Sequence, residues 1–528
     1  MSFINIHTNN LSRQLRNATT YLDNWIYVPG TAITGDWKKP YAFRSLDEFQ
    51  AACGTKSPEG SITYEYVAGL LSAGLPVLFR RIAYQNQNNL TEEDITSGRA
   101  VGVTRAELVL NHTDATTGVV SDDVSITEKY GGSFGNDLNI TIKISNGTTY
   151  YLEVYAKNTL VEKAKLLTLT PDDVNQTEIN QKLIDALNAL DMERISVTVL
   201  EEDASKFALE PVTNKYLTGG ADIDEGLVPA EIPASLDYIK DKILFQPKFL
   251  TSGGYVDSDV ATATPIADKM KELTKLRQDC RALLDLPIGT PAEQQQSLAE
   301  NYAYQQLGNN VEIPSASICA PWVYMQVGTE QLWMPPSYAF LTLVGNAVSG
   351  GGHAYTPKAG LSTGRLSNII KPEFEIGSTL SEQWQSDTDV NINPIMRLQS
   401  GSYIVAGNST LLMPDIDGME INAFQESSAD LTVIEIRRFV FNLATELQYQ
   451  YNGVAAFENF SLRTAKFFNV MVSEGAMSDY EITNLSSNND PRTLKVQIDV
   501  YLTPTIKKIE IFLNVAYGNI ELSTGGAE

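Results

Sequence analysis

Apolar and polar residues alternate with a period of two along several short segments of this chain, which is the pattern of half-buried β-strands. Such alternation fills residues 138–144, and Asn146-Gly147 then supplies the positive φ angles of a tight turn. A returning strand at 150–155 completes a predicted β-hairpin. Another alternating segment, 195–199, follows a helical stretch at 179–190, so this region predicts a β-rich lobe that contains one helix.

Upstream of this lobe the pattern is that of alternating helices and buried strands. Ser45 and Glu48 form a capping box, which predicts a short helix that begins there and ends at Gly54. A second helix is predicted from Ser61 to about Gly74, and the apolar run Val77–Phe79 then reads as a strand buried on both faces. Helix followed by buried strand is typical of an α/β layer.

The same α/β pattern resumes after Gly219-Gly220. Buried strands are predicted at 243–245, 283–286 and 318–324, and helices near 258–277, 291–306 and 336–348. We expect the segments before and after the lobe to share one sheet, since an insertion of this kind is tolerated where its two ends lie close together at the surface.

Two amphipathic helices are predicted in the C-terminal third. Thr432 to Glu435 reads as a second capping box, and the apolar stripe that follows consists of Val433, Ile436, Val440, Leu443 and Leu447, with Arg438, Asn442 and Glu446 off it. The next helix ends at Gly475, and its predicted buried face consists of Phe457, Phe460, Phe467 and Met471.

The chain closes with two regular strand patterns, 494–502 and 509–515, which Pro504 separates. A lone extended strand leaves its backbone N–H and C=O groups without partners, so the last strand must pair elsewhere if it leaves its own domain. Residues 1–20 are polar and rich in Asn, with only a brief apolar patch at Ile4 and Ile6. Both termini therefore read as arms.

The charge balance argues against nucleic acid as a partner. Acidic residues outnumber basic ones 64 to 39, giving a net charge of −25 that repels phosphate. The pairs Arg80-Arg81 and Arg437-Arg438 lie within apolar runs and favour structural ion pairing over phosphate contact. Three dispersed cysteines suit synthesis in a reducing compartment, and the sequence contains neither a signal peptide pattern nor an apolar run long enough to span a membrane.

No motif in the sequence predicts a catalytic, cofactor or metal site. The histidines His7, His112 and His353 have no cysteine at ligand spacing, and no nucleophile elbow is present. The glycine-rich stretches 131–136 and 349–352 lack the Gly-Lys-Ser/Thr ending of a phosphate loop, so they read as a turn and a flexible connection. The acidic stretches Asp222–Glu225 and Asp415–Gly418 lack the spaced ligands of a calcium loop and favour solvated turns, while a spatial pair of carboxylates for glycoside chemistry stays open.

Segments along most of the chain resemble the tail sheath proteins of contractile phages and related injection machines. Those that carry the resemblance are Tyr27–Ala32, Ser45–Phe49, Cys53-Gly54, Gly74–Ile82, Gly131–Ile140, Leu217–Gly220, Ala320–Trp322, Met334–Ser337, the helix with Ile436–Arg438, the helix that ends at Gly475, and the two final strands around Pro504.

This resemblance implies a multidomain fold of the α/β and α+β classes, with an α/β sheath core built from two separated chain segments, an inserted β-rich domain and extended terminal arms. The expected divisions are an N-terminal arm at 1–20, core segments at 21–90 and 228–505, an inserted domain at 91–227 and a C-terminal arm at 506–528. In that family the arms add strands to neighbouring subunits. On this chain the exchanged residues would be Phe3, Ile4, Ile6, Ile509, Ile511, Leu513 and Val515.

The resemblance further implies a non-enzymatic subunit, without cofactor, of a sheath that stacks in helical rings around an inner tube and contracts to drive it through a host envelope. The expected partners are further copies of the chain, the inner tail tube protein, and baseplate and tail terminator proteins, without direct nucleic acid contact or membrane insertion. The expected location is the virion, after assembly in the host cytoplasm. Two alternatives stay open: another virion or surface-array protein such as a baseplate or capsid subunit, and a tail-associated hydrolase.

Overall fold

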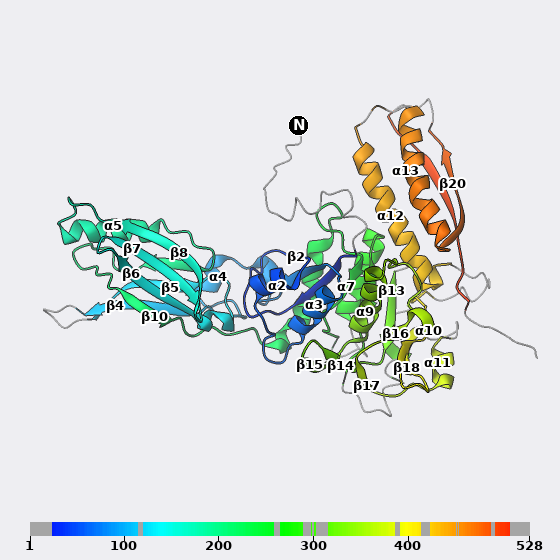
Figure 1. The fold of residues 1–528 in the computed structure, drawn as a ribbon, viewed down its shortest axis with the longest axis horizontal. Coiled ribbons are helices and arrows are strands. Elements are labelled where there is room, and N and C mark those ends of the chain that lie inside the picture. The colour runs from blue at the N-terminus through cyan, green and yellow to red at the C-terminus, as the bar shows by residue number, and fades with distance from the viewer. Residues whose placement is uncertain are drawn as a thin grey trace, which may run out of the picture.

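The computed structural model describes residues 24–113, 120–257, 264–288, 297, 300–302, 315–385, 391–412, 423–449, 451, 454–486 and 492–506. Three parts are visible in Figure 1: a β-rich lobe at one end, a central body of mixed helices and strands, and a pair of long helices with a narrow sheet that stands off the body.

A nine-stranded sheet forms the centre of the body, and most of its strands are parallel. In spatial order the strands are β16 (Arg365–Leu366), β19 (Tyr403–Val405), β18 (Ile392–Arg397), β13 (Ala316–Ala320), β12 (Arg281–Leu284), β11 (Phe249–Leu250), β1 (Ile26–Gly30), β3 (Val77–Arg81) and β2 (Tyr41–Phe43). Strand β1 pairs with β11 through Ile26 and Phe249. Chain segments on either side of the β-rich lobe therefore share one sheet, as the sequence predicts.

Successive residues of the inner strands enter two different cores, one on each face of the sheet. In β1, Ile26 and Val28 join one apolar cluster and Tyr27 the other. The first cluster includes side chains of α2 (Leu46–Cys53), α3 (Thr63–Ser72) and α9 (Pro336–Ser349), and the second includes those of α6 (Val228–Leu236) and α7 (Pro265–Arg277). Burial on both faces explains why these strands are continuous apolar runs.

The predicted signals at the start and end of α2 are confirmed. Ser45 Oγ accepts a hydrogen bond from the amide of Glu48 at 3.3 Å, and Gly54 follows the helix with a φ of 93°. The Glu48 carboxylate bonds the amide of Arg44 at 3.0 Å, one residue before the position that a capping box specifies. The predicted stop at Gly74 also has positive φ, at 80°.

The β-rich lobe, called the β-lobe here and comprising residues 106–217, has its own apolar core. The predicted hairpin is confirmed, with Asn146 and Gly147 at φ angles of 54° and 70°. One sheet consists of β10 (Val212–Tyr216), β6 (Leu138–Ser145), β7 (Thr149–Ala156) and β8 (Thr159–Thr168). Opposite it lie α5 (Gln176–Asn188) and the sheet of β4 (Glu107–Thr113), β5 (Val120–Glu128) and β9 (Ile195–Val199).

The body also contains smaller elements around the central sheet. These are α4 (Glu92–Thr96), α10 (Gly360–Thr363), α11 (Ser378–Trp384) and the three-stranded sheet of β15 (Glu330–Met334), β14 (Val323–Val327) and β17 (Ile369–Pro372). The predicted strand at 318–324 is therefore wrong as a single element. Strand β13 ends at Ala320, and β14 begins a different sheet at Val323 after the chain turns at Pro321.

The predicted strand at 243–245 is also wrong, because the backbone turns at residues 242–244. The Asp241 carboxylate accepts hydrogen bonds from the amides of Ile243 at 2.7 Å and Leu244 at 3.3 Å, which stabilises the turn. Ile243 is 70% exposed, so its apolar side chain is not evidence of a buried strand at this position. The strand of this region is β11, which begins at Phe249. Most of the helix predicted at 291–306 lies outside the described residues.

Two long helices, α12 (Ser427–Leu447) and α13 (Val454–Ser473), lead to a hairpin of β20 (Met477–Asn484) and β21 (Val496–Leu502). The predicted capping box at Thr432 is wrong, because α12 begins at Ser427 and Thr432 donates to the Ser428 carbonyl inside the helix. Phe460 and Met471 are buried in α13 as predicted, whereas Phe457 and Phe467 are half-buried. Strand β20 was not predicted.

A buried arginine connects the β-lobe to the body. Arg81, at the end of β3, donates to the carbonyls of Ala32, Gly35, Tyr130 and Gly131 at 2.7 to 3.0 Å. Burial lowers the pKa of Arg81, and the nearby Glu128 carboxylate opposes that shift. The sequence predicted structural ion pairing for this arginine, and the contacts that hold it are mainly with backbone carbonyls.

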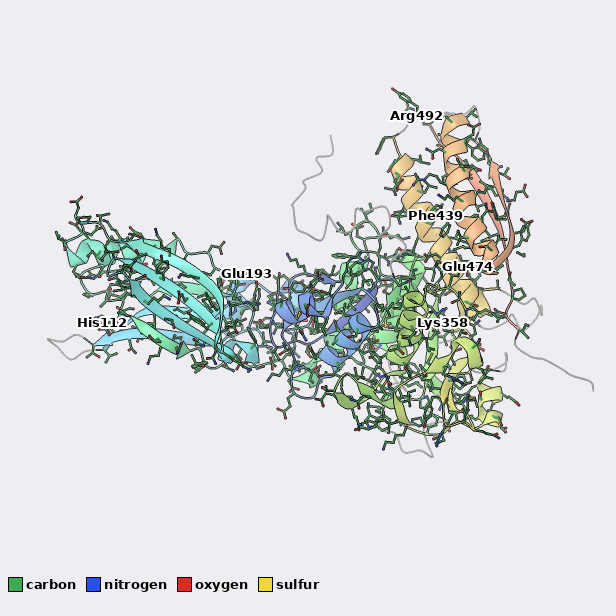
Figure 2. All side chains as sticks on the ribbon, viewed as in Figure 1. His112, Glu193, Lys358, Phe439, Glu474 and Arg492 are labelled. Atoms are coloured by element: carbon green, nitrogen blue, oxygen red, sulfur yellow. The ribbon has the colours of Figure 1, made fainter. Side chains whose placement is uncertain are left out.

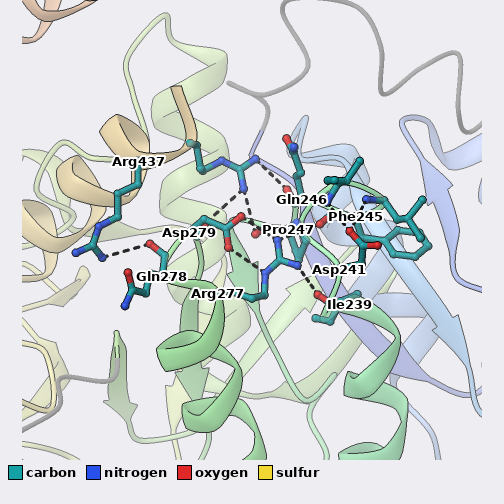
Figure 3. A network of polar contacts seen from close by, with 12 residues as sticks. Ile239, Asp241, Phe245, Gln246, Pro247, Arg277, Gln278, Asp279 and Arg437 are labelled. Atoms are coloured by element: carbon teal, nitrogen blue, oxygen red, sulfur yellow. Dashed lines mark hydrogen bonds and ion pairs between the residues drawn. The ribbon is translucent and has the colours of Figure 1, made fainter. Parts of the chain in front are cut away.

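Polar contacts also attach α12 to the body (Figure 3). Arg438 is buried and donates to the carbonyls of Gln246 at 2.9 Å and Pro247 at 3.2 Å, so its predicted place off the buried stripe is wrong. Its neighbour Arg437 is exposed and reaches the Gln278 carbonyl at 3.3 Å. These bonds satisfy carbonyls at the point where the helix pair leaves the body.

One turn before Arg438, Glu435 forms a buried ion pair with Lys248 at 2.5 Å. The two side chains are 6% and 2% exposed, and Asn24 Oδ1 also accepts from the Lys248 ammonium at 2.7 Å. Removing one partner of such a pair leaves an uncompensated charge in the interior, which typically costs about 3–5 kcal/mol. Replacing both by apolar side chains of similar size is often nearly neutral.

We expect Glu435→Gln to lower the free energy of unfolding of the helix pair and body by about 3 kcal/mol. The double variant Lys248→Met with Glu435→Leu should recover most of that loss, because it leaves neither charge unpaired. Urea denaturation followed by circular dichroism measures both. Equal destabilisation by the single and double variants would contradict the role given to this pair.

A second prediction concerns Asp285, a buried carboxylate at the first turn of α9. It accepts hydrogen bonds from the Ser337 amide at 2.9 Å and hydroxyl at 2.7 Å, yet burial raises its pKa to about 6. Because this pKa exceeds the unfolded value of about 3.9, the folded state binds the proton more tightly. The stability that this proton contributes is therefore present at low pH and lost as pH rises through 6.

Asp285→Asn should remove this pH dependence. Between pH 4 and pH 7, the stability of the native protein relative to that of the variant should fall by about 2–3 kcal/mol. Thermal unfolding at several pH values measures the difference, with Asp479→Asn on the exposed surface of β20 as the matched control. Parallel profiles for the native protein and Asp285→Asn would show that this carboxylate is not the cause.

Candidate assembly interface

The narrow sheet of β20 and β21 rests on α12 and α13 through an aromatic and aliphatic core. Phe439 of α12 stacks on Phe467 of α13 with ring centroids 4.1 Å apart, and Phe468 meets Tyr480 of β20 edge to face. Val496 and Ile498 of β21 pack against the cluster that contains Phe439. Strand β20 thus packs on α13, and β21 packs on a cluster to which both helices contribute.

This sheet has only two strands among the described residues. Its hairpin is antiparallel, with Ile482 opposite Ile498 at its middle. Each strand therefore has one edge whose backbone N–H and C=O groups pair with no other described strand. Such edges are templates for the addition of another strand, and an isolated two-stranded sheet is marginally stable without further strands or a helix layer.

A groove of about 630 Å³ lies next to β21. It runs between that strand and the last turns of α12, with Phe460 of α13 contributing to its lining. Its apolar side chains from α12, from β21 and from the segment just before β21 are Val440, Phe441, Ala444, Leu447, Leu494, Val496 and Ile498. Phe441 is 40% exposed, so apolar surface is available where a third strand would lie.

Figure 2 locates this groove on the molecule: Phe439 lies partway along the helix pair, and Arg492, which contributes to the groove, lies at the end remote from the body. Glu474 directly follows α13, at the end of the helix pair that is close to the body. Its carboxylate contacts His353 Nε2 at 2.8 Å and the Tyr355 hydroxyl. The groove is therefore at the projecting end of the unit, away from the central sheet.

The chain leaves β21 through a fixed point at the base of α12. The Glu426 carboxylate accepts hydrogen bonds from the Thr505 amide at 3.0 Å and the Thr505 hydroxyl at 2.8 Å. Glu426 is buried immediately before α12, and Asn408 bonds both the Ser428 amide and hydroxyl nearby. These contacts anchor the start of the C-terminal segment to the body.

The residues predicted to be exchanged between subunits, Phe3, Ile4, Ile6, Ile509, Ile511, Leu513 and Val515, lie outside the described residues. Their pairing stays a prediction. The sequence analysis did not predict the β20 strand or the groove next to β21. The alternation of Tyr480 and Ile482 with Asp479 and Glu481 was the available signal.

In the part of the chain that the structure describes, no cluster of three or more His, Cys, Asp or Glu side chains has the arrangement of a metal site. His112 contacts Asp123 at 2.7 Å within the β-lobe, and His353 contacts Glu474, so these two histidines lie far apart in the fold. No helix within the described ranges has the length and apolar character needed to cross a bilayer.

The fold of this chain is similar to the folds of solved structures, among them those of two sheath tail proteins. The sheath tail protein Lin1278 of Listeria innocua aligns with a TM-score of 0.60 and 11% identity over 94% of each chain. The sheath tail protein of Desulfitobacterium hafniense aligns with a TM-score of 0.55 and 10% identity over 92% of this chain and 95% of that one. No protein-family model and no curated protein matches the sequence.

Both alignments cover nearly the whole chain, so the likeness includes the β-lobe, the body and the helix pair together. The low identity means that it is a likeness of fold, carried by the order and packing of the elements. It agrees with the resemblance that the dispersed sequence segments indicate. This chain therefore has the mixed α/β fold of sheath tail proteins.

Proposed function

We propose that this chain is a structural, non-enzymatic subunit of a contractile tail sheath, which polymerises in helical rings around an inner tail tube. The observation that carries the proposal is the two-stranded sheet on α12 and α13, whose outer edges pair with no other described strand, and the apolar groove beside β21. The likeness of fold to two sheath tail proteins supports it.

The proposed link between subunits is β-strand addition. A donated strand at the free edge of β21 gains main-chain hydrogen bonds, and its alternate side chains enter the groove. The donors would be Phe3–His7 of one neighbour and Ile509–Val515 of another, as the resemblance to sheath proteins implies. Each apolar side chain that becomes buried contributes roughly 1.5–3 kcal/mol before the costs of ordering the arm are subtracted.

Glu426 and Thr505 have a specific part in this scheme. By fixing the chain at Thr505, they set the point from which residues 507–528 begin. The arm then remains attached to the body while body surfaces repack between an extended and a contracted arrangement. Strand exchange thereby holds neighbours together during contraction, whose force comes from a strained extended lattice without nucleotide or other cofactor.

The proposal includes the binding partners and the domain boundaries that the resemblance to sheath proteins implies. Copies of the chain, an inner tail tube protein, and baseplate and tail terminator proteins are the expected contacts in the virion, after assembly in the host cytoplasm. The net charge of −25 disfavours direct contact with nucleic acid. The division into arms at 1–20 and 506–528, core segments at 21–90 and 228–505 and an insertion at 91–227 belongs to this proposal.

Deletion of residues 507–528 tests the donor strand. The truncated chain keeps Thr505 and its bonds to Glu426, so we expect a soluble, folded body that no longer forms cylinders. Electron microscopy and sedimentation velocity of the purified protein measure assembly, and circular dichroism checks the fold. Cylinders from the truncated chain would contradict strand exchange, and flat arrays or closed shells from the full chain would overturn the sheath function.

Phe441→Glu tests the acceptor groove, since it places a charge where the donated strand would bury apolar side chains. We expect the protein concentration needed for assembly to rise at least about tenfold, which corresponds to a loss of about 1.4 kcal/mol. Leu462→Glu is the matched control, because Leu462 is an exposed apolar residue of α13 outside the groove lining. Equal effects of the two substitutions would contradict the proposed docking position.

A further inference from the structure

The outer face of the β6–β7–β8 sheet differs in charge from the rest of this acidic protein. Lys143, Lys163 and Lys165 project from it, with Tyr151 and Tyr155 between them. These side chains belong to opposed positions of neighbouring strands, such as Lys143 opposite Tyr151 and Tyr151 opposite Lys165. The Lys163 ammonium lies 4.1 Å from the centre of the Tyr151 ring. We call these residues the lysine face.

A buried carboxylate fixes two of these lysines in place. Glu153 is 2% exposed and contacts the ammonium groups of Lys143 at 2.7 Å and Lys163 at 3.0 Å, while its other oxygen accepts from the Tyr155 hydroxyl at 2.9 Å. An ammonium has three N–H donors, so each lysine keeps donors for another acceptor. One carboxylate between two ammonium groups leaves a net positive charge on the three groups. Because the ion pairs already hold both lysine side chains in place, binding another acceptor does not have to order them.

The opposite side of the same β-lobe is acidic. Helix α5 packs its apolar face into the core that the sheet covers from the other side, so its exposed face points away from the lysine face. Glu178 and Asp185 are exposed on α5, and Glu202 is exposed in the loop that follows β9. The nearby Lys182 is already paired with Asp173, and Lys206 with Asp203.

From this complementarity we infer that the lysine face of one copy binds the acidic α5 face of a neighbouring copy, in a head-to-tail contact between β-lobes. A contact between two different faces of one lobe repeats from copy to copy and generates rings or helices. The inference rests on the proposed function, because a sheath holds copies side by side. It adds a second lateral link, distant from the strand-exchange groove.

The contact is expected to be weak for each pair of copies. Exposed ion pairs contribute little individually and are screened by salt, so the contact should be clearest at low ionic strength. In an assembly that strand exchange already tethers, the local concentration of the second face is high, and weak contacts become effective. This contact therefore adds a small, salt-dependent contribution to the stability of the ring.

Cysteine cross-linking tests the contact directly. Full-length chains with Lys165→Cys are mixed at low salt, under mild oxidation, with chains that carry Asp185→Cys. The native cysteines are buried, and Lys165 does not contact Glu153, so neither interferes. We expect disulfide-linked dimers to form about tenfold faster than with the control partner Glu458→Cys on the exposed surface of α13.

Charge reversal provides the second measurement. For this measurement the cysteines are moved to Thr168→Cys on the lysine face and Asn188→Cys on α5. Lys163→Glu with Lys165→Glu, or Glu178→Lys with Asp185→Lys, should each slow cross-linking of this second pair about tenfold. The chain that carries all four reversals should recover the native rate, because opposite charges face each other again. Circular dichroism checks that each variant folds, and the α5 variant leaves Glu153 and its lysines intact.

The outcomes separate this inference from the proposed function. Normal cylinders without preferential cross-linking would overturn the inference and leave the sheath function standing. Failure of the full chain to form cylinders, with cross-linking preserved in solution, would overturn the sheath function and leave the contact standing. Tight binding of an acidic polysaccharide to the lysine face, again without cross-linking, would identify a polyanion as the ligand of this face. It would overturn the inference that a second copy of the chain binds there.

Discussion

The need of every backbone N–H and C=O group for a hydrogen-bond partner is the constraint on which this structure depends. The central sheet meets it by pairing nine strands from distant parts of the chain, with β1 between β3 and β11. Among the described residues, the hairpin of β20 and β21 meets it only along its inner edges. Its outer edges have no partner among the described strands, and an apolar groove lies next to β21.

The β-lobe has its own apolar core, whereas the apolar cluster on one face of the central sheet continues into α12, α13 and the hairpin of β20 and β21. Buried polar side chains add contacts at both junctions. Arg81 bonds carbonyls on both sides of the junction between body and β-lobe, and Arg438 of α12 bonds carbonyls of the body where that helix meets it. Lys248 and Glu435 add a buried charge pair at the second junction. Such contacts require a specific geometry, so they favour defined arrangements of rigid parts over continuous flexing.

Local patterns predicted the elements whose environment is uniform along their length. The hairpin at Asn146-Gly147 follows from turn chemistry and alternation, and α2 follows from Ser45 and Gly54. Predictions failed where a side-chain turn or a contact with distant residues overrode the local pattern. Ile243 is apolar and exposed because Asp241 forms a turn there, and Thr432 lies inside α12 because Asn408 and the body support an earlier helix start.

The sequence by itself determined the alternating segments, the turn positions, the acidic charge and the order of elements that resembles sheath proteins, because these depend on neighbouring residues. Only the tertiary structure decided that Arg438 is buried, that β20 pairs with β21, and that Lys143 and Lys163 converge on Glu153. Each of these depends on which strands and helices become neighbours in space. Spacing along the chain does not specify that, since the free energy of burial and pairing belongs to contacts between distant residues.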